Sequence, residues 1–212
     1  MKKLRGHFVI IFVIFTLLAP RRLLANITGS PHDFSGAYSN PHGRGEICQV
    51  CHTPHNAGSS QVPLWRGGLF IDYYKLYSSD TLDATVSQPR DGGSSKACLT
   101  CHDGSIAKGA LTGCQYCHNW GPRDTNLSND HPISFTYDAA LAQKDGALRD
   151  PGNTPVSSLG GKTIKEVMLS QNRMECSSCH DVHATKGDSA TARKLLLVNN
   201  AQDKLCFTCH IK

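Results

Sequence analysis

The ten cysteines of this 212-residue chain form five copies of one short motif. In each copy two residues separate the cysteines, and a histidine follows the second cysteine directly. This is the attachment sequence of c-type haem, in which both thiols add to the porphyrin vinyl groups and the adjacent imidazole ligates the iron. The sequence therefore predicts five c-type haems. The covalent tethers are Cys48, Cys51, Cys98, Cys101, Cys114, Cys117, Cys176, Cys179, Cys206 and Cys209, and the proximal iron ligands are His52, His102, His118, His180 and His210.

Three other uses of paired cysteines explain the pattern less well. Disulfides suit an exported protein, but they give no reason for a histidine after every pair, and redox Cys-x-x-Cys motifs have the same gap. A zinc ribbon needs two Cys-x-x-Cys units for each ion. Cys98–Cys101 and Cys114–Cys117 could form one such ribbon, but five units leave one without a partner.

The remaining histidines are equal in number to the expected haems. Outside the motifs and the first 25 residues, the chain has His32, His42, His55, His131 and His183. Haem iron in electron-transfer proteins takes a second axial ligand, commonly His or Met. These five are therefore the candidate distal ligands, which gives bis-histidine coordination throughout. Met168 fits a buried helix face with Ile164 and Val167 better than it fits an iron ligand.

His55 and His183 each lie three residues after a proximal histidine. A residue so close in sequence stays on the proximal side of its own haem, so it reaches the opposite face of that iron with difficulty. It can reach the iron of a neighbouring haem. The spacing therefore predicts pairs of haems in close contact, a geometry suited to electron transfer.

The first 25 residues have the layout of a secretory signal peptide. Lys2, Lys3 and Arg5 precede an apolar run over 8–19, and cleavage is expected after Ala25. Twelve apolar residues are too few to span a bilayer core as a helix. We therefore expect an exported mature chain, 26–212, with no membrane span after cleavage, in the periplasm or at the cell surface.

Removal of this leader also removes the positive charge of the chain. The full chain has a formal charge of +5, from 22 basic and 17 acidic residues. The leader holds five basic residues and no acidic one, so 17 of each remain. No cluster of Lys and Arg remains that could track phosphates, and nucleic acid is not an expected partner.

The mature chain provides about 37 residues for each haem, too few for a conventional core. The porphyrins must supply much of the apolar interior. We expect one pentahaem domain with a haem core, mostly irregular, with short α-helices and little β-structure. It begins with an N-terminal arm over 26–46. A helix is expected over 163–173, turns at Pro151-Gly152 and at Gly160-Gly161, and a short last helix carrying Cys206–His210.

The segments around the motifs resemble exported multihaem cytochromes c with doubled Cys-x-x-Cys-His motifs. The resemblance rests on 30–36 (SPHDFSG), 46–57 (EICQVCHTPHNA), 98–109 (CLTCHDGSIAKG), 127–138 (LSNDHPISFTYD), and the ECSSCHDVH and LCFTCH segments further on. Some such cytochromes polymerise into conductive filaments at the outer surface, where one haem takes a histidine from the next subunit. His32 resembles that donor, and His55, His131 and His183 resemble distal ligands. The third motif resembles an insertion into a four-haem pattern, with His42 as its extra ligand.

These features predict a protein that serves extracellular electron transfer and catalyses no reaction. Its partners would be redox proteins, and it could form a homopolymer in which His32 is donated to a neighbouring subunit. A soluble periplasmic five-haem carrier that delivers electrons to a terminal reductase is the second hypothesis. A multihaem reductase is the third, and it requires at least one five-coordinate iron open to substrate.

Overall fold

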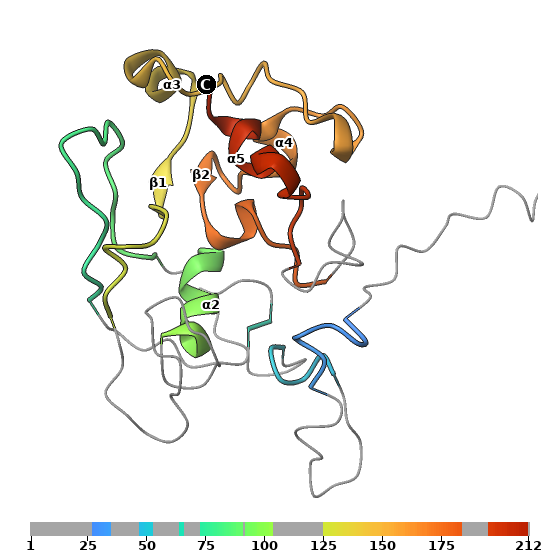
Figure 1. Ribbon diagram of the computed structural model, residues 1–212. Coiled ribbons are helices and arrows are strands. Elements are labelled where there is room, and N and C mark those ends of the chain that lie inside the picture. Colours follow the sequence, from blue (N-terminus) through green and yellow to red (C-terminus); the bar gives the residue numbers. More distant parts are fainter. Residues whose placement is uncertain are drawn as a thin grey trace, which may run out of the picture.

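In the part of the chain that the structure describes, the backbone is mostly irregular, with short helices and one two-stranded sheet (Figure 1). The computed structural model describes residues 27–34, 47–52, 64–65, 73–90, 92–103, 125–183 and 195–211. Within these ranges the α-helices are α2 (Ser94–His102), α3 (Ala139–Asp145), α4 (Ile164–Val167) and α5 (Lys204–Cys209). The 3₁₀ turns are η1 (Ser157–Leu159), η2 (Cys176–Ser178) and η4 (Ala201–Asp203), and the strands are β1 (Phe135–Thr136) and β2 (Arg173–Met174). The predicted fold class is confirmed. The predicted leader over 1–25 lies outside the described residues.

The helix expected over 163–173 is wrong in length, because α4 spans only four residues. It begins with a capping box, in which the Thr163 hydroxyl accepts from the Glu166 amide and the Glu166 carboxylate accepts from the Thr163 amide. It ends at Val167 with Met168 as its C-cap, and the positive φ angles of Gln171 and Asn172, 53° and 59°, exclude a helix over the rest of the predicted range. The chain then enters β2, which pairs antiparallel with β1.

The main core lies in the C-terminal half of the chain. Ile164 and Met168 are buried there at 0% and 3% exposure, as expected for a buried helix face. The other buried members come from β1 and the residue after it, α3, the residue before η1, β2 and the last segment: Phe135, Tyr137, Leu141, Ala142, Val156, Met174, Leu197, Val198 and Cys209. A smaller cluster, with Tyr74, Leu99 and Leu127, packs around α2. No helix in the described ranges is long and apolar enough to cross a membrane.

The C-terminal helix α5 is tied to the core through residues 147–149. The Arg149 amide donates to the Cys209 carbonyl at 2.8 Å, and its guanidinium Nε donates to the Phe207 carbonyl at 3.1 Å. The buried Tyr137 hydroxyl donates to the Arg149 carbonyl at 2.6 Å. The backbone beyond α5 continues the attachment, because the Ile211 amide donates to the Ala147 carbonyl at 2.7 Å. These bonds fix the position of the last cysteine motif.

Candidate haem attachment sites

Four of the five motifs lie in the described ranges, and three of them share a local geometry. The amide of the motif histidine donates to the carbonyl of the first cysteine at 2.9 Å for His52, 3.1 Å for His180 and 2.9 Å for His210. This bond closes one helical turn, so two cysteines three residues apart lie close together beside the histidine. The second motif lies in the last turn of α2. The third, Cys114 to His118, lies outside the described residues.

The described thiols are available for covalent attachment. None of Cys48, Cys51, Cys98, Cys101, Cys176, Cys179, Cys206 and Cys209 forms a disulfide. The described ranges also contain no cluster of three or more His, Cys, Asp or Glu side chains able to hold a metal ion by themselves. An iron bound in a porphyrin needs only two ligands from the protein, so pairs of side chains are the relevant arrangement.

Among the described residues there are three such pairs, and each joins one motif histidine to one histidine from outside the motifs. The ring centres of His102 and His32 lie 6.0 Å apart, those of His52 and His183 lie 6.0 Å apart, and those of His210 and His131 lie 6.4 Å apart. Two imidazoles on opposite sides of one metal ion have centres roughly 6.2 Å apart, since each metal–nitrogen bond is about 2.0 Å and each nitrogen lies about 1.1 Å from its ring centre. The three separations therefore fit an iron atom between the rings.

His183 contacts a motif distant from its own. It follows His180 by three residues, yet its ring lies near that of His52, with an interplanar angle of 18°. His183 thus lies beside the first motif and not only beside the motif that precedes it. His32 packs against His102 of the same chain, whereas the resemblance implies that His32 serves the next subunit. His42, His55 and His118 lie outside the described residues.

The hydrogen bond of His131 selects the tautomer that a metal ligand requires. Its Nδ1 lies 2.9 Å from the Pro132 carbonyl oxygen, which can only accept, so Nδ1 carries the proton. Nε2 then holds the free lone pair, and a second hydrogen bond of this kind is typical of metal-bound histidine. His32 differs, because its Nδ1 is buried without a hydrogen-bond partner.

Partial burial favours the neutral form of three of these imidazoles. It lowers the pKa of His32, His102 and His210, and neighbouring histidines lower each pKa further: His102 and His180 for His32, His180 for His102, and His131 for His210. Nearby carboxylates act against this lowering, Asp103 on His102 and Asp145 on His210. Only a neutral imidazole can ligate a metal. The environment of these rings therefore favours the form that binds iron.

The fourth motif lies at the centre of the four that are described. Its first cysteine, Cys176, and Cys98 of the second motif interact directly, which raises the pKa of Cys98 and lowers that of Cys176. Its second cysteine, Cys179, lies near the fifth motif. Burial raises the pKa of Cys179 to about 11, and both Cys176 and Cys206 add to this. Together with the His183–His52 pair, these contacts bring the fourth motif and its following residues to the other three described motifs.

The structure identifies residues that the motifs did not indicate. Glu175 lies directly before the fourth motif and is 2% exposed. In the sequence, only its position next to Cys176 could have indicated a role. Trp65 lies beside the first motif, with its ring centre 6.3 Å from that of His52 in an edge-on contact. Its indole Nε1 is buried without a hydrogen-bond partner. In the sequence, Trp65 is part of no periodic pattern that could have indicated this contact.

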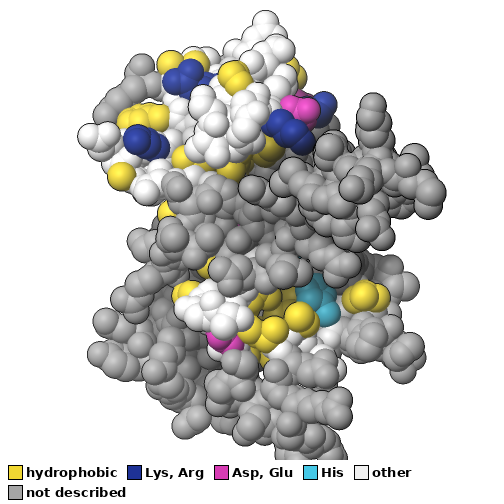
Figure 2. Space-filling view, turned by 90° about the vertical axis from the view of Figure 1, so that its right-hand side faces the viewer, with side chains coloured by type: hydrophobic (Ala, Val, Ile, Leu, Met, Phe, Trp, Pro, Cys, Tyr) yellow, Lys and Arg dark blue, Asp and Glu magenta, His cyan; other side chains and the backbone are white. Residues whose placement is uncertain are grey.

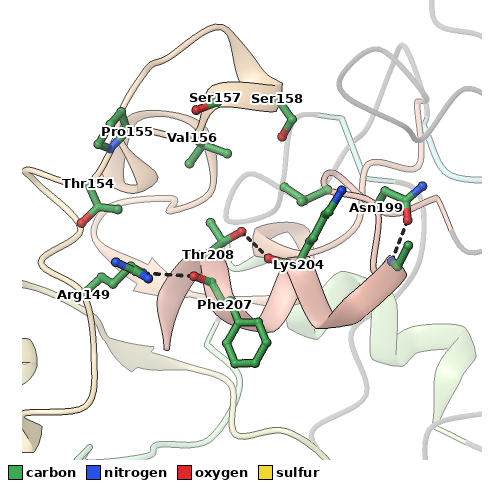
Figure 3. Close-up of a pocket in the computed structure, with 12 residues that line it drawn as sticks. Arg149, Thr154, Pro155, Val156, Ser157, Ser158, Asn199, Lys204, Phe207 and Thr208 are labelled. Atoms are coloured by element: carbon green, nitrogen blue, oxygen red, sulfur yellow. Dashed lines mark hydrogen bonds between the residues drawn. The ribbon is translucent and has the colours of Figure 1, made fainter. Parts of the chain in front are cut away.

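A surface cavity of about 620 Å³ lies beside α5, between this helix and the segment around η1 (Figure 3). Lys204 and Thr208 line it from one face of α5, four residues apart, and the Thr208 hydroxyl donates to the Lys204 carbonyl at 2.9 Å. At 100° per residue, Cys206 and Cys209 point to the opposite side of the helix. A haem joined to these two cysteines would therefore lie away from the cavity.

Figure 2 shows which side chains are exposed on one face of the molecule. In Figure 2 exposed histidine lies beside hydrophobic side chains in the lower part of the molecule. The described Lys and Arg side chains on this face form separate small groups in its upper part (Figure 2).

Comparison with known families gives one match. Residues 170–212 match the model of a doubled CXXCH motif. This segment contains the fourth and fifth motifs, and the match supports a protein of the multihaem c-type cytochrome kind, with covalently bound haem and a role in electron transfer. A search of curated proteins found no match to the chain.

Proposed function

We propose that this protein transfers electrons through five c-type haems, each iron held between two histidines. The observation that carries the proposal is the set of three histidine pairs at 6.0–6.4 Å, each with one motif histidine and one from outside the motifs. Covalent haem supplies the redox chemistry when bound. The protein contributes tethers, neutral imidazoles and close spacing between neighbouring motifs.

The pairs suggest an assignment of axial ligands. His32 would ligate the iron of the His102 haem, His183 that of the His52 haem, and His131 that of the His210 haem. His55 follows His52 with the same spacing that His183 has from His180. We therefore assign His55 to the His180 haem, so that the first and fourth motifs exchange ligands. His42 is then left for the His118 haem.

Coordination by two imidazoles also bears on catalysis. A six-coordinate iron offers no open position to a substrate. The proposal therefore describes a carrier that exchanges electrons with redox protein partners, and not an enzyme. A multihaem reductase would instead keep at least one iron five-coordinate.

The site of action follows from the leader and the cofactor. Covalent haem attachment typically takes place outside the cytoplasm, and 1–25 have the layout of a signal peptide. We propose that the chain is exported to the periplasm or the cell surface and serves electron transfer there.

The intrachain contact between His32 and His102 favours a carrier whose ligands come from one chain. The alternative is an outer-surface filament, in which His32 is donated to the next subunit. The two differ in solution: a monomer with five six-coordinate haems supports ligation in cis, whereas association that disappears in His32→Ala supports the filament.

Ferric-state electron paramagnetic resonance of the mature holoprotein tests the assignment. Mass spectrometry first counts the covalent haems, with five expected. All irons should be low-spin in the wild type, and His131→Ala should convert one of the five to high-spin. His131→Met is the matched control, because a thioether keeps the iron six-coordinate while raising its potential. A wild type with no haem, or three alanine variants at His32, His131 and His183 that all stay fully low-spin, would contradict the proposal.

A further inference from the structure

A carboxylate is buried between two of the haem attachment motifs. The side chain of Glu175 is 1% exposed. Its Oε2 accepts from the Ser95 amide at 3.2 Å, at the start of α2, and its carboxylate also accepts from the Ser178 amide at the end of η2. α2 carries the second motif and η2 the fourth. One buried side chain thus joins the backbones of both.

The start of α2 is shaped to receive this carboxylate. Its N-cap residue, Gly93, provides no side-chain cap, and an added Cβ there would lie 3.2 Å and 3.3 Å from the Glu175 carboxylate oxygens. Because Gly93 has no side chain, the Glu175 carboxylate can approach the start of α2. The amide groups at a helix start favour a negative charge, so Glu175 caps α2 from a distant part of the chain.

Two further contacts join the same elements. The Ser94 and Ser177 hydroxyls lie 2.7 Å apart, and the Cys176 amide donates to the Ser95 hydroxyl at 3.0 Å. These bonds set the first cysteines of the two motifs, Cys98 and Cys176, side by side. Haems tethered to them would share the environment of Glu175.

The charge of Glu175 is only partly offset. Arg173 donates from Nε to its Oε1 at 3.4 Å, and the Arg173 side chain is 17% exposed. The guanidinium is directed away from the motifs, because its terminal nitrogen donates to the Ser87 hydroxyl and the Ser134 carbonyl. The carboxylate acts on both cysteines. The pKa of Cys98 is raised by its contact with Cys176, then by burial, and also by Glu175. The same carboxylate opposes ionisation of Cys176.

We propose that Glu175 is a positioning residue that holds the second and fourth motifs together and supplies a fixed negative charge that lowers the reduction potentials of their haems. This inference rests on the proposed function. A ferric haem carries one more positive charge than a ferrous haem, so a nearby anion stabilises the oxidised state. Electrons would therefore favour other haems over these two.

Spectroelectrochemical titration of the holoprotein tests this role. In Glu175→Gln the reduction potentials of two haems should rise. The ratio of ferric to ferrous haem at a fixed potential should then fall on the order of tenfold. This is the effect of one unit charge at about 10 Å with an effective dielectric constant near 20. The matched control is Glu166→Gln, which removes an exposed carboxylate and should leave all potentials unchanged. Arg173→Gln should shift the same two haems in the opposite direction, because it removes the cation that offsets Glu175.

The outcomes separate this inference from the proposed function. A wild type without covalent haems defeats the proposed function itself. A wild type with five haems, and a Glu175→Gln variant that is less stable but has unchanged potentials, overturns the present inference alone. If Glu175→Gln does not mature, Arg173→Gln decides: potentials shifted down support the role of Glu175, and unchanged potentials refute it.

Discussion

Replacement of Tyr137 by phenylalanine should loosen the C-terminal motif without disturbing the core around it. Tyr137 is 1% exposed, and its hydroxyl donates to the Arg149 carbonyl at 2.6 Å and lies 3.4 Å from the Cys209 carbonyl. Phenylalanine keeps the ring and removes only the hydroxyl. The Arg149 carbonyl then loses its donor, at the point where residue 149 holds α5.

The expected cost follows from this single bond. A net hydrogen bond contributes about 0.5–1.5 kcal/mol, and an acceptor left without a partner adds to the loss when it is buried. We expect Tyr137→Phe to lower the free energy of unfolding by about 1–2 kcal/mol. For a chain of this length each kcal/mol corresponds to roughly 2–4 °C in melting temperature. The melting temperature should therefore fall by roughly 2–8 °C.

The pH dependence adds an independent check. Burial is the main reason that the pKa of Tyr137 is raised well above its ordinary value. A raised pKa in the folded state means that the stabilisation is fully present below the unfolded value, about pH 10, and is lost as the pH rises through the folded pKa. The difference between wild type and variant should thus be constant from pH 7 to 9 and shrink at higher pH.

Thermal unfolding of the holoproteins, followed by far-ultraviolet circular dichroism, measures both effects. Tyr73→Phe is the matched control, because Tyr73 is 80% exposed and its hydroxyl is expected to contribute little. Equal melting temperatures for the two variants at pH 7 would refute the argument that the Tyr137 hydroxyl secures α5.

Two further variants test local features of the fold. Asp138→Ala removes the N-cap of α3, in which the Asp138 carboxylate accepts from the Leu141 amide at 2.9 Å. This variant should lower the free energy of unfolding by about 1 kcal/mol in the same thermal assay. The control is Asp80→Ala at an exposed position, and equal stability of the two variants would contradict the prediction. Met168→Leu preserves volume in the core, so it should cost less than about 1.5 kcal/mol and leave every haem low-spin. A new high-spin signal in that variant would instead identify Met168 as an iron ligand.

The sequence predicted local features well where the signal lies in a few adjacent residues. The turns at Pro151-Gly152 and Gly160-Gly161 are present, and α5 carries Cys206 and Cys209 as expected. The helix over 163–173 was predicted too long, because the apolar positions Ile164, Val167 and Met168 fill only its first half and Gln171 and Asn172 have positive φ angles. The segment that follows pairs as β2 with β1, a contact between segments nearly 40 residues apart in sequence.

Contacts across long separations could not be read from the sequence. Counting histidines gave five candidates for five irons, but only the fold brings His183 to His52 and His32 to His102. The role of Glu175 was equally hidden, because its partner Ser95 lies 80 residues away. Haem proteins of this kind have little hydrophobic periodicity, so sequence patterns carry weak information about which motifs meet.

The fourth motif is close to each of the other three described motifs. Its residues meet the second motif at Cys98, the first through His183 and the fifth near Cys206. If each motif carries a haem, electrons that enter at the first, second or fifth can reach the others through the fourth. The buried carboxylate of Glu175 lies at this junction, where a lowered potential would hinder residence of the electron on the second and fourth haems and favour its onward passage. If our proposal for Glu175 holds, the haem of the fourth motif would pass electrons to its neighbours without retaining them.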